Sequence, residues 1–197
     1  REVLAICKAI RAVGTAPDFI VVDGSEGGTG AAPIDFEDHM GMPLTHGLML
    51  MHNALVGTGL RDQIKIGASG KVAGGSDIVM RMIQGADYTN SARAMMMATG
   101  CIQAQRCHTG ECPTGVATQD PRRNRAIVVE DKSKAVYNFH KTTVSTAVRL
   151  MASMGVSDPS ELRPDMLRRS VSPTESRSYA SIYEWLRPGP VSYTHLR

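Results

Sequence analysis

The sequence has few aromatic residues and no long apolar run. Phe, Trp and Tyr make up 5% of its 197 residues, whereas Gly occurs 19 times and Met 12 times. This composition predicts many tight backbone turns and an interior of aliphatic side chains. No run approaches the roughly 18 apolar residues that a membrane-spanning helix needs, and no signal peptide is visible. We therefore expect a cytoplasmic protein without a membrane segment.

The sequence also lacks a strong charge of either sign. Its net charge of +3 is too small to indicate a nucleic acid partner, and no nucleic-acid-binding motif is present. Residues 121–169 hold ten Lys or Arg against five Asp or Glu, and so carry +5. Such a segment usually forms a solvated face. An acidic partner or substrate is the alternative interpretation.

The length suits one domain with its own core, because 42% of the residues are apolar and 21% are charged. The first residue is Arg1 rather than Met, and it lies inside an apolar helical pattern. This start predicts that the chain is a piece of a longer protein.

Helical and extended patterns alternate along the first half of the chain. Helices are predicted over residues 1–13, 44–56, 76–84 and 92–99, and strands over 19–23, from Ile64 to the glycine loop at 70, and over 87–91. The segment 19–23 is apolar and rich in β-branched residues, which is typical of a buried parallel strand. The alternation predicts an α/β fold with a parallel sheet.

Glycine-rich loops follow the carboxyl ends of these strands, where the functional loops of a (β/α)₈ TIM barrel lie. Such a barrel needs about 250 residues. With three strands visible, we interpret residues 1–120 as the C-terminal part of a barrel, about strands 6–8, including a cysteine loop at 101–112. A helical extension is predicted over 121–169, with one long amphipathic helix at 133–154. We exclude residues 170–197 as a non-native or disordered tail.

Two successive strands are followed by small polar residues. Ser69 and Gly70 follow one strand, and Asn90 and Ser91 follow the next. In barrels, the loops after the last two strands often bind a phosphate, and glycine allows the backbone to approach it closely. The alternative is that the glycines simply end the strands. Two such loops in succession favour the phosphate site.

A third loop, residues 24–30, contains four glycines in seven residues. This loop would let a flat ring or a small acid lie against the backbone. Asp23 and Glu26 are the carboxylates near it. Glu26 is a candidate for a catalytic role, and a solvated side chain is the alternative.

Three cysteines, Cys101, Cys107 and Cys112, occur within twelve residues. Without a secretory signal, a metal or redox site is favoured over disulfides. One possibility is zinc held by the three thiolates and His108. The other is an iron–sulfur cluster, because a Cys-Pro pair ends bacterial iron–sulfur runs and three thiolates suit a three-iron cluster. The fourth cysteine, Cys7, is expected to be a buried small hydrophobe.

Three segments together carry a resemblance to a known family. They are VVDGSEGGTGAAP, IKIGASGKVAGGSDIV and CIQAQRCHTGECPTGVATQDP. They resemble the FMN-binding synthase domain of glutamate synthase, most closely its short members without a glutaminase domain. The resemblance runs over about residues 1–169, and the C-x5-C-x4-C element followed by PTGVATQ is highly specific. The glycine loops alone would also fit other phosphate-binding barrels, such as inosine monophosphate dehydrogenase.

The resemblance implies a (β/α)₈ barrel with FMN at its carboxyl-terminal face. The implied site residues are Ser69, Gly70, Asn90 and Ser91 for the FMN phosphate; Gly27, Gly28, Thr29 and Gly30 beside the flavin and 2-oxoglutarate; and Cys101, Cys107 and Cys112 as ligands of a 3Fe–4S cluster. The implied reaction forms 2-iminoglutarate from ammonia and 2-oxoglutarate and reduces it to L-glutamate. Electrons would come through the cluster from an NADPH-dependent subunit or a ferredoxin.

The chain departs from the family pattern in its extent. The first five strands of the barrel and their flavin-side residues are missing, so we expect this chain alone to be inactive. It has no N-terminal cysteine nucleophile, so ammonia would come from solution or from glutamine through a separate glutaminase. The competing interpretation is another phosphate-binding barrel, of the nucleotide dehydrogenase or isomerase type, with structural zinc at the cysteines.

Overall fold

The computed structural model describes residues 1–24, 32–33, 35–36 and 39–188. Helices and strands alternate over the first half of the chain, as the sequence predicts. The elements are α1 (Glu2–Val13), β1 (Phe19–Asp23), α2 (Leu44–Gly57), β2 (Lys65–Ser69), α3 (Gly75–Ile83), β3 (Tyr88–Asn90) and α4 (Arg93–Ala98). The predicted α/β order is therefore confirmed.

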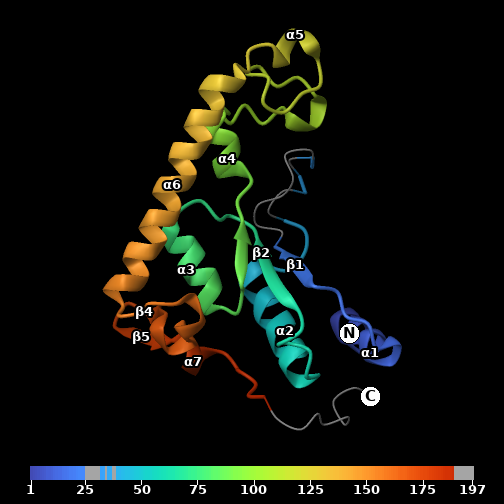
Figure 1. The fold of residues 1–197 in the computed structure, drawn as a ribbon, viewed down its shortest axis with the longest axis vertical. Helices are drawn as coiled ribbons and strands as arrows, with labels where there is room; N and C mark the ends of the chain where they lie inside the picture. Colours follow the sequence, from blue (N-terminus) through green and yellow to red (C-terminus); the bar gives the residue numbers. More distant parts are fainter. Residues whose placement is uncertain (25–31, 34, 37–38, 189–197) are drawn as a thin grey trace.

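The three strands form a parallel sheet in the order β1-β2-β3 (Figure 1). In its register, Asp23 lies opposite Ser69, and Ser69 lies opposite Asn90. Parallel strands present their carboxyl ends at one edge of the sheet. The residues that follow β2 and β3 are therefore neighbours in space although they are about twenty residues apart in sequence.

The main core lies between α2 and the sheet. Leu44, Leu48 and Leu55 recur on one face of α2 and are fully buried, as are Ile64 and Ile66. Cys7 on α1 is fully buried in the same cluster, so the prediction that it is a small core residue is confirmed. This core is aliphatic, as the low aromatic content predicts.

The expectation that β1 is a buried strand is only half right. Ile20 and Val22 pack against the core, but Phe19 is 57% exposed and Val21 is 40% exposed. Side chains alternate between the two faces of a strand, and among the described elements α2 covers one face only. Along the exposed face, Phe19 meets the ring of Tyr88 edge-on, with centroids 6.2 Å apart.

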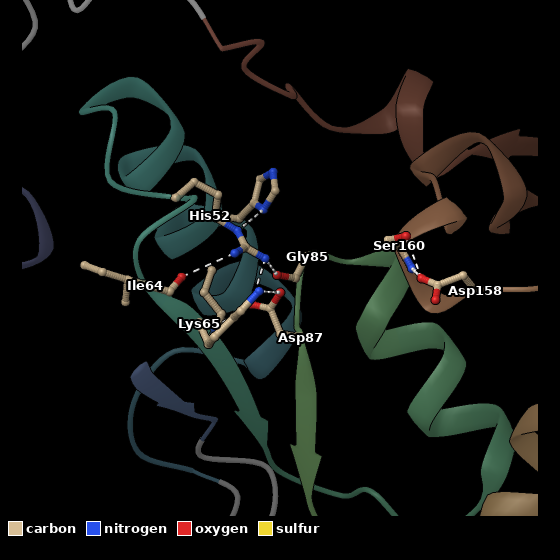
Figure 2. A network of polar contacts seen from close by, with 9 residues as sticks. His52, Ile64, Lys65, Gly85, Asp87, Asp158 and Ser160 are labelled. Carbon is tan, nitrogen blue, oxygen red and sulfur yellow. Dashed lines mark hydrogen bonds and ion pairs between the residues drawn. The ribbon is translucent and has the colours of Figure 1, made fainter. Parts of the chain in front are cut away.

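A polar network joins β2 and β3 at their amino ends, away from the carboxyl ends described above (Figure 2). The Arg61 guanidinium forms an ion pair with Asp87 at 2.9 Å and donates to the carbonyl oxygens of Ile64 and Gly85. It also donates to His52 Nδ1 at 3.4 Å. Burial, and then the charge of Arg61, lower the pKa of His52. The neutral ring therefore remains an acceptor for Arg61.

The second half of the chain is mostly helical. It contains α5 (Pro121–Asn124), α6 (Val129–Ser153) and the short 3₁₀ helices η1 (Cys107–Thr109), η2 (Pro159–Glu161) and η3 (Pro164–Met166). The long helix is the predicted one, but it starts four residues earlier. Val79 and Ile83 of α3 form a second core with Ala147 of α6. Among the described residues, no helix combines the length and apolar character needed to cross a membrane.

Residues 168–188, most of which belong to the segment excluded above as a non-native or disordered tail, contain regular elements. They form the antiparallel hairpin β4 (Arg168–Ser172) and β5 (Glu175–Ser178), followed by α7 (Tyr179–Ile182). Tyr179 is buried. Periodicity cannot reveal this segment, because its strands are short and mostly exposed and its order comes from contacts with distant residues.

Residues 183–186, which we call the strap, lie against α2. The Asn53 side chain donates to the carbonyl oxygen of Glu184 at 2.8 Å and accepts from the N–H of Leu186 at 3.1 Å. The ring of Trp185 meets His52 edge-on, with centroids 5.6 Å apart. The end of the described chain is thus joined to α2, in the first third of the sequence.

The crossing of α3 and α6 depends on a glycine. A Cβ atom on Gly75 would lie 2.5 Å from the backbone nitrogen of Ala147 and 2.8 Å from the carbonyl oxygen of Thr143. We predict that Gly75→Ala lowers the free energy of unfolding by about 1–3 kcal/mol, the usual cost of overpacking, in a urea titration. Gly74→Ser is the matched control, because that position has extended backbone and no neighbour closer than 4.0 Å. Equal stability of the two variants would contradict the close approach of the helices.

Candidate functional site

The carboxyl ends of β2 and β3 bring together the four residues predicted to bind phosphate. Ser69 and Asn90 are register partners, and Gly70 and Ser91 follow them directly. The Ser91 hydroxyl donates to the carbonyl oxygen of Val72 at 2.7 Å, which joins the two loops. The four predicted residues therefore share one edge of the sheet.

Gly70 occupies a position that only glycine fits easily. Its φ is +141°, and a Cβ atom there would lie 3.3 Å from Leu44 Cδ2 and 3.4 Å from the carbonyl oxygen of Gly24. The N–H of Gly24 in turn donates to the carbonyl oxygen of Ser69 at 2.8 Å. Packing alone thus accounts for glycine at this position, and a bound phosphate would use the same close approach.

The start of α3 differs from its prediction in one respect. The helix is predicted to start at residue 76, but its N-cap is Gly74, and Asp77 lies in the first turn. Its carboxylate reaches back and accepts from the N–H groups of Ala73 at 3.0 Å and Gly74 at 2.9 Å. An anion at this edge would therefore need other N–H groups of the two loops.

The three clustered cysteines line one small cavity. Cys101, Cys107 and Cys112 share it with Met96, Pro113 and neighbouring residues. Cys112 is buried, and the other two are half-buried. The first of them is placed by α4, because the Cys101 N–H donates to the carbonyl oxygen of Met96 at 3.0 Å. The three cysteines of the C-x5-C-x4-C element therefore border one cavity.

The backbone between the first two cysteines adopts an unusual conformation. Gln103 has a φ of 57° and Gln105 a φ of 54°, in the left-handed region that residues other than glycine rarely visit. The Gln103 N–H points at Cys101 Sγ, 3.4 Å away. Strained backbone of this kind tends to occur at functional sites. Here it accompanies the approach of the Gln103 N–H to Cys101 Sγ.

The environment of Cys112 favours its thiolate. Burial raises the pKa of this thiol, but hydrogen bonds from the Thr114 side chain and from the backbone of Ala117, Thr114 and Val116 outweigh burial and lower the pKa to about 7. The Thr114 hydroxyl lies 3.5 Å from Cys112 Sγ. The thiolate is the form that ligates metals, so Cys112 suits a metal-bound sulfur.

The arrangement does not support zinc held by three thiolates and His108. His108 is not among the residues that line the cysteine cavity. In the described part of the chain, no three His, Cys, Asp or Glu side chains lie close enough to hold one metal ion. A cluster of several irons is larger than one ion, so it tolerates a wider separation of its ligands.

Some predicted residues lie outside the described part of the chain. These are the catalytic candidate Glu26 and the residues predicted to border the flavin, Gly27, Gly28, Thr29 and Gly30. They remain predictions. The sequence did not reveal Thr114 as a partner of the site. Its only signal is a hydroxyl residue two positions after a cysteine.

A family model described as a conserved region in glutamate synthase matches residues 3–157. The chain belongs to the glutamate synthase family. It is 43% identical over 146 residues to the glutamate synthase large subunit-like protein YerD of Bacillus subtilis, an alignment that covers 74% of this chain and 28% of the relative.

Other members of the glutamate synthase family are also similar to the chain. It is 36% identical over 146 residues to the archaeal glutamate synthase (NADPH) of Methanocaldococcus jannaschii, covering 74% of this chain and 29% of the relative. It is 38% identical over 138 residues to a ferredoxin-dependent glutamate synthase of Pyropia yezoensis, covering 70% and 9%. The chain thus spans less than a third of the length of these relatives.

One solved structure has a similar fold. A mutant flavocytochrome b2 with pyruvate bound matches 98% of this chain and 37% of its own, with a TM-score of 0.51 and 15% identity. At this identity the likeness concerns the fold alone. It agrees with the parallel α/β arrangement of this glutamate synthase family member.

The carboxylate that caps α3 gives a test of the loop after β2. We predict that Asp77→Ala lowers the free energy of unfolding by about 1 kcal/mol, the typical cost of a lost helix cap, because two N–H groups lose their acceptor. Asp77→Asn keeps an oxygen acceptor and should lose less. Urea titrations of both variants measure the difference, and a fully stable alanine variant would show that these N–H groups have another acceptor.

Proposed function

We propose that this chain is the C-terminal part of the barrel of a glutamate synthase, about strands 6–8, with the helical extension after residue 120. The whole protein would convert 2-oxoglutarate and ammonia to L-glutamate with FMN and a 3Fe–4S cluster. The observation that carries the proposal is the single cavity lined by Cys101, Cys107 and Cys112.

The cysteine cavity fits an iron–sulfur cluster in its chemistry. Iron–sulfur clusters are held by thiolates, and hydrogen bonds to the sulfurs help to set their reduction potential. The three thiols and Thr114 line the cavity, with the Thr114 hydroxyl beside Cys112 Sγ, and the Gln103 N–H of the same loop points at Cys101 Sγ. A buried thiol whose pKa is lowered to about 7 is suited to ligation.

The edge formed by β2 and β3 supports a flavin phosphate site. Ser69, Gly70, Asn90 and Ser91 lie together there, and the loops after the last two strands are the usual phosphate site of a barrel. FMN, when bound, supplies the hydride chemistry that reduces 2-iminoglutarate. The role of this chain would be to hold the phosphate and to place the cysteine loop beside the sheet through β3 and α4.

The electron donor would be a reduced protein partner. Relatives of this chain are named as NADPH-dependent and as ferredoxin-dependent glutamate synthases. Conversion of 2-oxoglutarate and ammonium to glutamate and water consumes two electrons and two protons. Either kind of donor provides these electrons.

The cluster assignment predicts a loss of iron in single cysteine variants. Cys101→Ser, Cys107→Ser and Cys112→Ser should each lower iron and acid-labile sulfide in the purified full-length protein, because each removes one of three ligands. Cys7→Ala is the control, since Cys7 lies in the core of α1 and α2. Iron and sulfide contents equal to wild type in all three serine variants would refute the assignment.

The flavin assignment predicts a charge effect at Gly70. Gly70→Asp should bind FMN at least tenfold more weakly than Gly70→Asn, a difference of about 1.4 kcal/mol, because only the aspartate repels a phosphate. The two side chains have nearly the same shape and strain the backbone equally, so the asparagine variant controls for the φ of +141°. Fluorescence titration of the apoprotein with FMN measures both affinities, and equal affinities would count against the assignment.

A further inference from the structure

The cysteine cavity contains one side chain that can act on the sulfurs without being a ligand. Thr114 lines the cavity and places its hydroxyl 3.5 Å from Cys112 Sγ. In the free thiol, either the oxygen or the sulfur can donate this hydrogen bond. A ligated cysteine has lost its proton, so the hydroxyl would then be the only possible donor.

The surroundings of Thr114 and Cys112 strengthen the hydrogen bond between them. Cys112 is 6% exposed and Thr114 is half-buried, so the accepting sulfur is largely shielded from water. Hydrogen bonds are electrostatically stronger in such a setting than in water. Thr114 is a side chain whose hydrogen bond to Cys112 Sγ can be removed by substitution.

A hydrogen bond to a cluster sulfur draws negative charge away from the cluster. It stabilises the reduced state, which carries one more electron, more than the oxidised state. Outer hydrogen bonds are a recognised means by which a protein sets a reduction potential. Loss of the donor therefore shifts the potential to a more negative value.

We propose that Thr114 is a positioning residue that raises the reduction potential of the cluster by donating a hydrogen bond to Cys112 Sγ. The proposal rests on the proposed function, because it requires a cluster on Cys101, Cys107 and Cys112. It assigns Thr114 the task of making the cluster a better electron acceptor for the donor protein. Thr114 itself is neither a ligand nor a catalytic residue.

The test is a potentiometric titration of the full-length purified protein, followed by the visible absorbance and electron paramagnetic resonance of the cluster. Thr114→Val should keep the iron and sulfide content of wild type and shift the midpoint to a more negative value. A tenfold change in the reduction equilibrium corresponds to 59 mV for a one-electron couple, and we expect a shift of about this size. Thr114→Ser keeps the hydroxyl and should restore the potential of wild type.

Two further variants make the result decisive. Thr118→Val removes a hydroxyl from the same loop that donates to the carbonyl oxygen of Gly110 rather than to sulfur, and it should leave the potential unchanged. Thr114→Ala removes the hydroxyl without the added methyl group of valine, and it should behave as Thr114→Val.

Three results would overturn the role proposed for Thr114. Equal potentials in wild type and Thr114→Val, or an equal shift in Thr118→Val, would overturn the proposal. Loss of the cluster from both Thr114→Val and Thr114→Ala would also overturn it, by giving the hydroxyl a structural role. A wild-type protein without iron and sulfide would instead overturn the proposed function, and this inference with it.

Discussion

Backbone hydrogen bonds between three short parallel strands hold Asp23, Ser69 and Asn90 in one row across the sheet. The position of the whole candidate site follows from this register. The loops after β2 and β3 meet because their strands end together, and α4 follows β3 and leads directly to Cys101. A three-residue strand and a six-residue helix thus connect the cysteine cavity to the edge of the sheet where the phosphate site is proposed.

The glycines near this edge have two possible roles that the sequence alone does not separate. A Cβ atom on Gly24 would lie 2.4 Å from Leu44 Cβ, and one on Gly67 would lie 2.5 Å from the Tyr88 ring. Gly24 is small because the end of β1 lies close to α2, and Gly67 because the Tyr88 ring of β3 lies beside it, with or without a ligand. Gly70 is different, because it combines close packing with a positive φ at the exact turn where a phosphate is proposed. At Gly70, a substitution that adds charge distinguishes phosphate binding from close packing, whereas a substitution that adds only size does not.

The sequence predicts a helix or strand well where its apolar pattern is sustained or where a glycine marks its end. This is why α1, β1, α2 and β2 appear within one or two residues of their predicted bounds. It predicts burial less well, because periodicity shows which face is apolar but not whether another layer covers that face, as Phe19 and Val21 illustrate. It does not predict the hairpin and short helix within residues 168–188, a segment that contacts distant residues such as Asn53 and His52. It finds the three cysteines but not Thr114, because hydrogen bonds to sulfur depend on the folded loop.

The contact between Asn53 and the strap has a consequence for the chemical ageing of the protein. The Asn53 amide donates a hydrogen bond to the carbonyl oxygen of Glu184 and accepts one from the N–H of Leu186. Deamidation would replace the donating nitrogen with an oxygen and would set a negative charge against the carbonyl oxygen of Glu184. The bond to Leu186 would survive and the bond to Glu184 would become a repulsion. A single slow hydrolysis in α2 would therefore loosen the strap, residues 183–186, without breaking the chain.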